Sequence, residues 1–519
     1  MPVSRTVCAI TILMSTLSLH AADQVRVSGG LLEGTTGSRP GIRAFLGIPY
    51  AAPPVGPRRW KAPEAAIKWT GIRPANRFGN RCVQTSPFPD MVFQSPAESE
   101  DCLYLSVWTP ARTAGEKLPV MVWIHGGGYF SGASDERRHD GSVLASKGVI
   151  LVTLNYRLGV LGFLAHPDLT AESPYKASGN YGLLDQIAAL RWVHDNIAAF
   201  GGDPAKVTVF GESAGSFAVS ALMASPMANG LFARAIGESG AHFSAPDGTL
   251  ATAPLAKAER WGTELATSMG ARTLADLRAL PAASFAKAIA ANPTKFSPVV
   301  DGYSLTADPW DIFAQGKQSH VPLLAGWNSA ESKVMIPSAS NAAALEAELR
   351  KQFPGKEAEA MKAYPACDAW QTKLSAIALT SDNFLVYSTW KWIEMHLATG
   401  KSPVYRYLFD HVIPTETGDA PADDPGAQHA SDIEYVFSTL DTRKLAWRAS
   451  DRKVADLFTS YWTNFAKTGN PNGPGLPQWP AYDTAKRQLL RLNANPKAET
   501  ETNRARYELQ DAVTIQLRK

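Results

Sequence analysis

The chain has 519 residues, of which 45% are hydrophobic and 19% charged, a globular composition with ample material for a core. Its formal net charge is only +3, and no run of lysines or arginines is present, which excludes the electrostatic footprint of a nucleic-acid-binding protein. The length allows several domains, but large α/β enzymes also reach it as one unit with insertions.

The first 22 residues are typical of a secretory signal. Arg5 supplies the positive start, residues 7–19 form a short apolar stretch, and Ala21-Ala22 offers small residues for cleavage. This apolar stretch is too short to span a bilayer, and no later stretch is long enough either. We therefore expect a signal peptide at 1–22, a secreted or periplasmic location, and no stable membrane anchor on the mature chain 23–519.

Three cysteines remain once the signal is removed. Cys82 and Cys102 close a modest loop, and in an exported protein this favours a disulfide between them. Cys367 is then unpaired, and we expect it to be a buried free thiol. No cluster of His or Cys has the spacing of metal ligands, so we expect no metal site.

In chain order, the N-terminal half alternates strand and helix patterns. Apolar or alternating runs predict strands at 42–54, 103–108, 119–124, 149–154 and 207–210, the first of them at an edge of the sheet. Helical spacing of apolar residues predicts a long helix over 183–197. Alternation of this kind indicates a mostly parallel sheet.

The C-terminal half adds further strands and two helical insertions. Ala-rich sequence predicts helices without strands at about 247–298, and a second helical stretch is predicted at about 340–400. The runs 321–325 and 403–409 predict strands, and a helix is expected around 457–465. Neither an internal repeat nor a long linker is present, so we expect one domain, 23–519, with these two helical insertions.

The strongest functional signal is Gly211-Glu212-Ser213-Ala214-Gly215. It lies between the β-branched run 207–210 and an apolar helical pattern that begins at Phe217. A nucleophilic serine needs a sharp strand-to-helix turn, where side chains at the flanking glycines would collide with the neighbouring strand and helix. An ordinary turn that contains a serine is the alternative, because G-x-S-x-G also occurs by chance.

His125 is followed by three glycines, Gly126 to Gly128. As a dinucleotide-binding fingerprint the run fails, because Ser131 stands where the third glycine is needed. As an oxyanion loop it fits, because consecutive glycines let the backbone approach a bound carbonyl and turn two N–H groups towards it. A plain glycine-rich turn is the alternative.

In a fold of this kind an acid and a histidine follow the serine, each from a loop at the carboxyl edge of the sheet. His396 lies in a helical stretch and His411 directly follows a strand, so both have structural explanations. His429 follows the long loop that starts at 412 and precedes a helical pattern, which makes it the best candidate base. Glu331 and Asp301 both lie near strand ends, but Asp301 has the setting of a turn residue.

With these residues in place, the chain resembles the type-B carboxylesterase/lipase family, which includes bacterial p-nitrobenzyl esterases, animal carboxylesterases and cholinesterases. The resemblance covers nearly all of residues 30–485. It is carried by the motifs GIPYAAPPVGPRRW, EDCLYLSVWTP, WIHGGGYFSG, LVTLNYRLGVLGFL, VTVFGESAGS, HASDIEYVF and YWTNFAKTGNPN. It implies an α/β-hydrolase fold, with a mostly parallel central sheet, helices on both faces and inserted helical lobes.

The resemblance implies Ser213 as nucleophile, Glu331 as acid and His429 as base. His429 would take the serine proton during attack on an ester carbonyl, and water would then hydrolyse the acyl-enzyme. No cofactor is implied. One departure concerns the acid, because the family usually has Asp-Glu-Gly where this chain has Ala330-Glu331-Ser332.

Further features come from the same resemblance. The oxyanion donors would be the backbone N–H groups of Gly127, Gly128 and Ala214. Glu212 and Ser239 match positions that form a polar network behind the catalytic residues. The resemblance also implies the disulfide Cys82–Cys102 and the buried ion pairs Arg59–Glu100 and Arg157–Asp185.

A small-molecule ester is the implied partner, and the oligomeric state stays open. A hydrolase of lactones, polyesters or amides could use the same machinery. A non-catalytic, adhesion-type member of the fold is the rival from another class. Such proteins lose the serine or the histidine, whereas this chain has both.

Substrate preference is predicted from two positions of the cholinesterases. Their disulfide loop holds a quaternary ammonium against a tryptophan, whereas this loop has no tryptophan and places Val92 there. Phe88 and Phe93 could contact a ligand, although core packing is the role that we expect for both. Pro246 stands at the position where the cholinesterases have the tryptophan of their acyl pocket, which predicts a more open pocket for the acyl group of the substrate. We therefore expect neutral esters with short to medium acyl chains.

Overall fold

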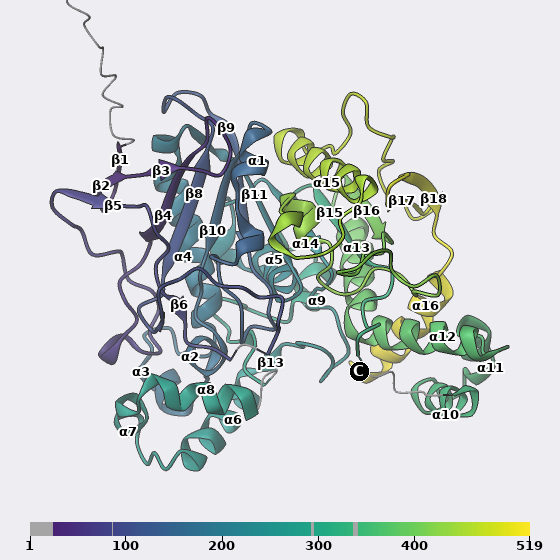
Figure 1. Ribbon diagram of the computed structural model, residues 1–519. Coiled ribbons are helices and arrows are strands. Elements are labelled where there is room, and N and C mark those ends of the chain that lie inside the picture. Colours follow the sequence, from purple (N-terminus) through teal and green to yellow (C-terminus); the bar gives the residue numbers. More distant parts are fainter. Residues whose placement is uncertain (1–23, 86, 292–294, 336–340) are drawn as a thin grey trace, which may run out of the picture.

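A twisted sheet of 11 strands runs through the molecule (Figure 1). The computed structural model describes residues 24–85, 87–291, 295–335 and 341–519. The signal peptide expected at 1–22 lies outside these residues. In sheet order the strands are β18 (Lys497–Thr500), β17 (Gln488–Leu492), β16 (Val404–Phe409), β15 (Leu323–Asn328), β12 (Arg234–Glu238), β11 (Gly202–Glu212), β9 (Leu118–Ile124), β10 (Ile150–Leu154), β8 (Tyr104–Thr109), β4 (Arg43–Pro49) and β3 (Thr35–Thr36).

The centre of this sheet is parallel and its two ends are antiparallel. Strands β17, β16, β15, β12, β11, β9 and β10 run parallel to one another, whereas β18, β8, β4 and β3 pair antiparallel. The fold is therefore the predicted mostly parallel α/β sheet. Because parallel strands end at one edge, the loops after β11, β12 and β15 meet there.

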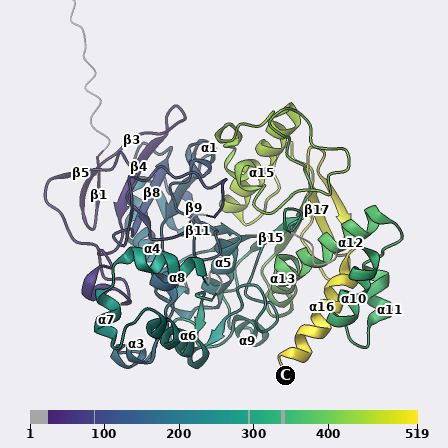
Figure 2. The same cartoon turned by 60° about the horizontal axis from the view of Figure 1, so that its bottom comes forward.

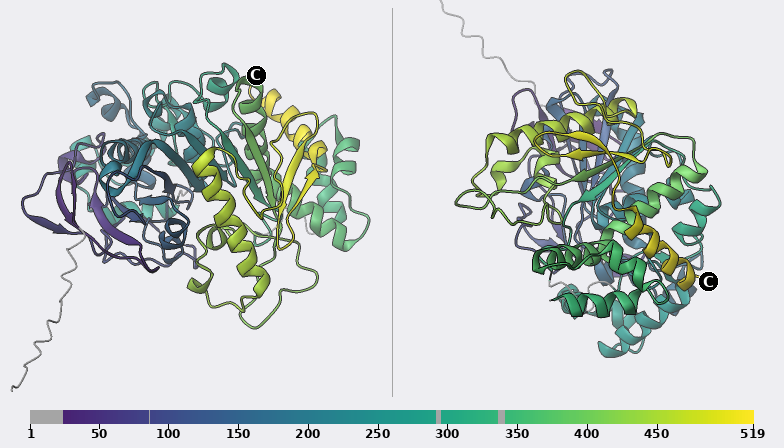
Figure 3. Two further views of the ribbon diagram at one scale, coloured as in Figure 1. Left: turned by 90° about the horizontal axis from the view of Figure 1, so that it is seen from above. Right: turned by 90° about the vertical axis from the view of Figure 1, so that its right-hand side faces the viewer.

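The central strands are buried on both faces, which explains their continuous apolar sequences. In β9, Val120, Val122 and Ile124 face one core, and Met121 and Trp123 face the other. Helices α4 (Tyr181–Asn196), α5 (Ala214–Ala224) and α13 (Tyr387–Thr399) cover the first face. Helices α1 (Ser142–Ser146), α14 (Ile433–Phe437) and α15 (Ala449–Thr468) cover the second, and Figure 3 shows α15 along one side of the strands.

Two groups of helices extend beyond the sheet. The first, at the lower left of Figure 1, contains α6 (Leu255–Ser268), α7 (Leu274–Ala279) and α8 (Ala282–Ala291). The second contains α10 (Ala342–Gln352), α11 (Glu357–Ala363) and α12 (Ala369–Ser381), followed by a π-helical turn, Asp382–Val386, that leads into α13. Helix α16 (Arg504–Leu517) packs beside this second group in Figure 2 and shares a small apolar core with it.

The structure corrects several sequence expectations. A short strand, β13 (Ala253–Pro254), lies in the stretch expected to be purely helical, and it pairs with β14 (Val299–Val300). Strand β4 is not an edge strand, because the two residues of β3, too few for a recognisable pattern, pair beyond it. Strands β12, β17 and β18 and helix α16 were not predicted. Cys367 is exposed rather than buried, since it lies in a surface loop between α11 and α12.

The disulfide loop is tied to the body of the molecule. Cys82 and Cys102 form a disulfide, and both are buried. The two implied ion pairs are present: Arg59 contacts Glu100 at 2.5 Å, and the buried Arg157 contacts Asp185 at 2.8 Å. Arg59 also donates to the carbonyls of Arg278 and Leu280 at the end of α7 and beyond it. The loop therefore joins the sheet to the first helical group.

Replacing both half-cystines, Cys82→Ser with Cys102→Ser, should lower the free energy of unfolding by about 3 kcal/mol. The reason is that a cross-link across this loop restricts the unfolded chain. Urea unfolding followed by tryptophan fluorescence measures the change. Cys367→Ser is the matched control and should leave the midpoint where it is. Equal stability of the double variant and the native chain would contradict the prediction.

Candidate active site

The candidate residues come together at the carboxyl edge of the sheet. Ser213 directly follows β11, Ser239 directly follows the neighbouring β12, and Glu331 lies three residues after β15. The registers of these strands are parallel, with Glu212 opposite Glu238 and Glu238 opposite Gly326. His429 arrives from the loop between β16 and α14.

Ser213 occupies a strained turn between strand and helix. Its φ of 54° and ψ of −124° lie outside the usual regions for a residue with a side chain. A Cβ on Gly215 would lie 2.0 Å from the Ile124 carbonyl oxygen, and one on Gly211 would lie 2.6 Å from the same atom. The two flanking glycines are thus required by close backbone approach. The Ser213 N–H donates to the carbonyl of Glu238 at 2.8 Å, which holds the turn.

A continuous chain of hydrogen bonds links serine, histidine and glutamate. The Ser213 hydroxyl lies 3.0 Å from His429 Nε2, and His429 Nδ1 lies 2.8 Å from Glu331 Oε2. Because the carboxylate binds Nδ1–H, Nε2 is left to accept the serine proton. The other oxygen of Glu331 accepts from the Ser239 hydroxyl at 2.5 Å and from the Asn328 N–H at 2.7 Å. Glu331 is therefore buried, fully hydrogen-bonded and fixed in direction.

The three glycines 126–128, here called the glycine loop, pack directly against the turn 211–215 that carries Ser213, here called the serine turn. A Cβ on Gly126 would lie 2.7 Å from a carboxylate oxygen of Glu212 and 3.1 Å from the Cβ of Ser213. Gly127 and Gly128 follow with positive φ values of 99° and 63°, which glycine adopts readily. Ala214 is the first residue of α5, where N–H groups have no partner within the helix.

Glu212 places a second carboxylate beside the histidine. Its Oε1 lies 3.4 Å from His429 Nε2, and among the described residues this buried oxygen accepts no hydrogen bond. Burial raises the pKa of Glu212 to about 8, although the positive charge of His429 opposes the rise. Burial alone would lower the pKa of His429. The charge of Glu212 and the hydrogen bond and charge of Glu331 outweigh burial and raise the pKa to about 9. The carboxylates of Glu212 and Glu331 therefore stabilise a positive charge on the imidazole when it forms.

The structure adds residues that sequence reasoning missed. Asn328 donates its amide to Asp432 at 3.1 Å and to the carbonyl of Gln428 at 2.8 Å, which joins the acid loop to the histidine loop. Burial raises the pKa of Asp432 to about 6. Phe384, from the π-helical turn, packs edge-on against the His429 ring at a centroid distance of 5.2 Å. Asp432 lies in the HASDIEYVF motif, so a signal existed for it, whereas Phe384 had none.

The alternative candidates have partners of their own. His411 Nε2 lies 2.7 Å from an oxygen of Asp451, and His396 Nε2 lies 2.9 Å from the carbonyl of Val321. Asp301 accepts three backbone N–H bonds, from residues 303 to 305, as a turn carboxylate does. These residues therefore have structural partners and no contact with Ser213.

The disulfide loop differs from the expectation at one residue. Phe88 is 36% exposed and its ring lies 5.8 Å from that of Phe130, so the expected core packing of Phe88 is wrong. Phe93 is half-buried beneath the guanidinium of Arg81. Val92 is 43% exposed. The loop thus presents apolar side chains to the surface rather than burying them.

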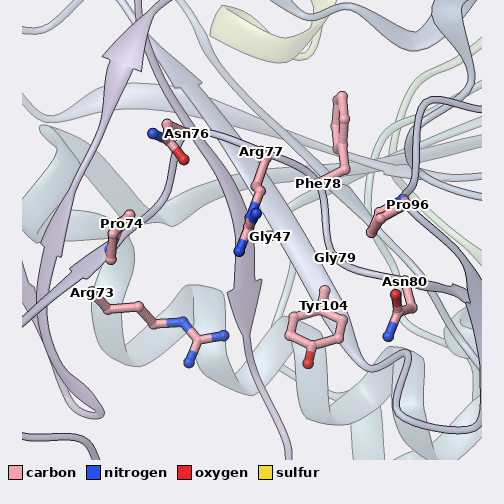
Figure 4. Close-up of a pocket in the computed structure, with 10 residues that line it drawn as sticks. All are labelled: Gly47, Arg73, Pro74, Asn76, Arg77, Phe78, Gly79, Asn80, Pro96 and Tyr104. Atoms are coloured by element: carbon pink, nitrogen blue, oxygen red, sulfur yellow. The ribbon is translucent and has the colours of Figure 1, made fainter.

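Two cavities lie away from the hydrogen-bonded residues Ser213, His429 and Glu331. One, of about 710 Å³, is lined by Arg73, Arg77, Asn80 and Tyr104 among others, and Figure 4 shows these side chains. Another, of about 490 Å³, is lined by Pro246, His242 and Trp310 among others. His242 Nε2 lies 3.1 Å from the hydroxyl of Tyr129, the residue after the glycine loop. The second cavity therefore has a wall in contact with that loop.

The part of the chain that the structure describes has neither a candidate metal centre nor a candidate membrane span. In that part, His, Cys, Asp and Glu side chains nowhere gather in a group of three or more that could hold a metal ion. None of its helices combines the length and apolar character needed to cross a bilayer.

Glu212→Gln should lower the pKa of the His429 imidazole by about one pH unit or more, because it removes a negative charge 3.4 Å from Nε2. A pH titration of the His429 ring protons by NMR measures this. Glu64→Gln, at an exposed carboxylate paired with Arg58, is the control and should leave the titration unchanged. An identical His429 titration in the Glu212 variant would show that this carboxylate does not influence the imidazole.

Comparisons with known proteins point to one family. The model of the Carboxylesterase family matches residues 21–510. A fumonisin B1 esterase from Sphingopyxis macrogoltabida is 36% identical, over 88% of this chain and 83% of its own. The para-nitrobenzyl esterase of Bacillus subtilis is 37% identical, over 91% and 95%, and the human cocaine esterase is 35% identical, over 90% and 86%.

A solved structure supports the same family assignment. A PNB esterase structure, 34% identical, superposes with a TM-score of 0.80 and covers 94% of this chain and 99% of its own. The architecture is that of an α/β-hydrolase. The chain therefore belongs to the Carboxylesterase family and is a carboxylic ester hydrolase.

Proposed function

We propose that the protein cleaves carboxylic esters through a Ser-His-Glu triad and an acyl-enzyme intermediate. The observation that carries the proposal is the hydrogen-bonded chain from Ser213 to His429 at 3.0 Å and from His429 to Glu331 at 2.8 Å. This is the relation of nucleophile, base and orienting acid that acyl transfer requires.

In the first step Ser213 Oγ attacks the ester carbonyl, and its proton passes to His429 Nε2. The imidazolium then gives that proton to the leaving alcohol, and an acyl group remains on Ser213. In the second step His429 takes a proton from water as the water oxygen attacks the acyl carbonyl; the bond from the carbonyl carbon to Ser213 Oγ then breaks, the acid leaves, and His429 returns the proton to Ser213. Glu331 keeps Nδ1 protonated throughout, so that Nε2 faces the reaction.

The oxyanion of each tetrahedral intermediate would be held by the N–H groups of Gly127, Gly128 and Ala214. Their support is the packing of the glycine loop against the serine turn and the position of Ala214 at the start of α5. Donors in such a place act mainly in the transition state, where the charge develops. Ser239 supports the triad through Glu331, and Glu212 stabilises the charged imidazole that forms during attack.

For the substrate we propose neutral esters with short to medium acyl chains. The disulfide loop has no tryptophan to hold a quaternary ammonium. Pro246 is exposed and lines the cavity of about 490 Å³. His242 lines the same cavity and contacts Tyr129, the residue after the glycine loop. This arrangement supports an open pocket for the acyl group. Lactones, polyesters and amides are alternative substrates for the same machinery.

We further propose that residues 23–519 act as one domain and that the protein is exported. The support for export is the Cys82–Cys102 disulfide, since disulfides persist in oxidising compartments. The support for one domain is that the chain returns to the same sheet after each group of helices: α13 packs against β15, and α9 (Pro309–Ala314) packs against α13 and α5.

Ser213→Ala should reduce kcat for p-nitrophenyl butyrate by about 10⁴-fold or more with the fold retained, because the nucleophile is lost. His429→Ala should have a similar effect. An organophosphate should label Ser213 with one equivalent, as seen by mass spectrometry of the peptides.

The controls for the triad are the other candidates. His411→Ala and His396→Ala should retain most of the activity, and Glu331→Gln should cost far more rate than Asp301→Asn. A label on a different serine, or an inactive His411 variant with an active His429 variant, would show that the triad is misassigned.

Neutral esters should be better substrates than choline esters, because the described loop provides no aromatic face at the position of Val92. The measurement is kcat/KM for p-nitrophenyl butyrate against butyrylthiocholine. A thiocholine value equal to or above that of the neutral ester would refute the substrate proposal while leaving the triad intact.

A further inference from the structure

The side-chain amide of Gln84 binds Ser131 and Gly132, the residues that follow the glycine loop 126–128 and fold back against it. Its Oε1 accepts from the Gly132 N–H at 2.8 Å and from the Ser131 hydroxyl at 3.2 Å. Its Nε2 donates to the carbonyl of Gly132 at 3.1 Å and to that of Cys82 at 3.0 Å. A glutamine amide offers two donor hydrogens and two acceptor lone pairs. Gln84, only 4% exposed, uses all of them.

The direction of this amide is set by its partners. If it were reversed, its NH₂ would face the N–H of Gly132, and its oxygen would face the carbonyls of Gly132 and Cys82. Donor would then meet donor and acceptor would meet acceptor in a buried place, which is strongly unfavourable. Only one arrangement satisfies both backbone groups of Gly132.

The residues that Gln84 holds are folded tightly onto the glycines. The Ser131 N–H donates to the Gly127 carbonyl at 2.9 Å. A Cβ on Gly127 would lie 2.3 Å from the Ser131 carbonyl oxygen, and one on Gly132 would lie 2.6 Å from that of Gly126. With no free space between the two sides of the turn, a shift of 131–132 moves the backbone of Gly127 and Gly128 as well.

Gln84 is itself anchored through the disulfide. It lies two residues after Cys82, whose carbonyl it binds, and Cys82 is bonded to Cys102 close to the start of β8. The line of contacts thus runs from the sheet through the disulfide and the Gln84 amide to the glycine loop. A polar group buried and satisfied in this way gives direction to a loop that has few side chains of its own.

We propose that Gln84 is a positioning residue, which sets the direction of the Gly127 and Gly128 N–H groups towards the ester oxyanion. The inference rests on the proposed oxyanion role of those two glycines. Since the donors act on charge that develops in the transition state, loss of the Gln84 amide should affect kcat and leave substrate binding nearly unchanged.

The test is Gln84→Met, which keeps the length of the side chain and removes its amide. We expect kcat for p-nitrophenyl butyrate to fall about 10- to 100-fold, less than or comparable to the loss of a whole oxyanion donor, with KM nearly constant. A trifluoromethyl ketone, which adds to Ser213 and places its oxyanion in the same hole, should bind more weakly by the same factor as kcat/KM falls.

Gln318→Met is the matched control. Gln318 is also buried, its amide donates to Thr399, and it precedes β15 at the amino edge of the sheet, away from the site. It should leave both kcat and the ketone affinity unchanged. Should Gln84→Met fail to fold, Gln84→Asn serves instead, because its amide is one methylene too short to keep both bonds to Gly132 and adds no charge; the same fall in kcat and in ketone affinity is expected.

The proposal is overturned if the folded Gln84 variant keeps the native kcat, if only its KM changes, or if kcat falls while the ketone binds as before. Failure of the proposed function looks different. In that case Ser213→Ala would stay active, or the native enzyme would not bind the ketone, whatever residue stands at 84.

Discussion

The backbone contact between β9 and the serine turn is the constraint on which the site depends. The Ile124 carbonyl lies so close to Gly211 and Gly215 that neither can carry a side chain. The contact forces the chain to turn at Ser213 with a positive φ, and strain of this kind persists only where the surroundings hold it. The parallel strands β11 and β12 do so, through the hydrogen bond from the Ser213 N–H to Glu238. The turn exposes the hydroxyl above the sheet and starts α5 directly behind it.

Buried negative charge is the second theme of the site. Glu212 and Glu331 contact His429, Asp432 lies three residues after it, and all three carboxylate side chains are buried. Unpaired buried carboxylates are costly, so the arrangement is stable only because His429 offers positive charge and because Ser239, Asn328 and backbone groups donate hydrogen bonds. The neighbouring carboxylates raise the pKa of the imidazole, which is the direction required by the proposed role of His429 as a base.

Segments far apart in the chain meet around Ser213. The disulfide loop contacts the glycine loop through Gln84, and its Phe88 packs against Phe130, two residues after that loop. The second helical group contributes Phe384 from a π-helical turn, and turns of this type are frequent at functional sites. The parallel sheet supplies the chemistry at a fixed edge, and the inserted and looped segments shape its surroundings.

Local patterns in the sequence were enough to determine the parallel sheet, the serine turn and the glycine loop. A buried strand, a close backbone approach and a helix start each require particular residues at fixed short spacing, as the stretch from 207 to 217 shows. His429 also followed from the order of elements, since few histidines lie beyond β15. The ion pairs Arg59–Glu100 and Arg157–Asp185 came from resemblance and are present in the structure.

Only the tertiary structure decided the rest. Strand β3 has only two residues, and β12 reads Arg-Ala-Ile-Gly-Glu with no continuous apolar run, so pairing with neighbours rather than sequence pattern makes them strands. The edge-on contact of Phe384 with His429 and three of the four bonds of Gln84 depend on partners distant in the chain, and the exposure of Cys367 and Phe88 depends on what the folded chain leaves uncovered. The raised pKa values of Glu212 and His429 do so as well, because burial and neighbouring charge arise only when separate loops are brought to one edge of the sheet.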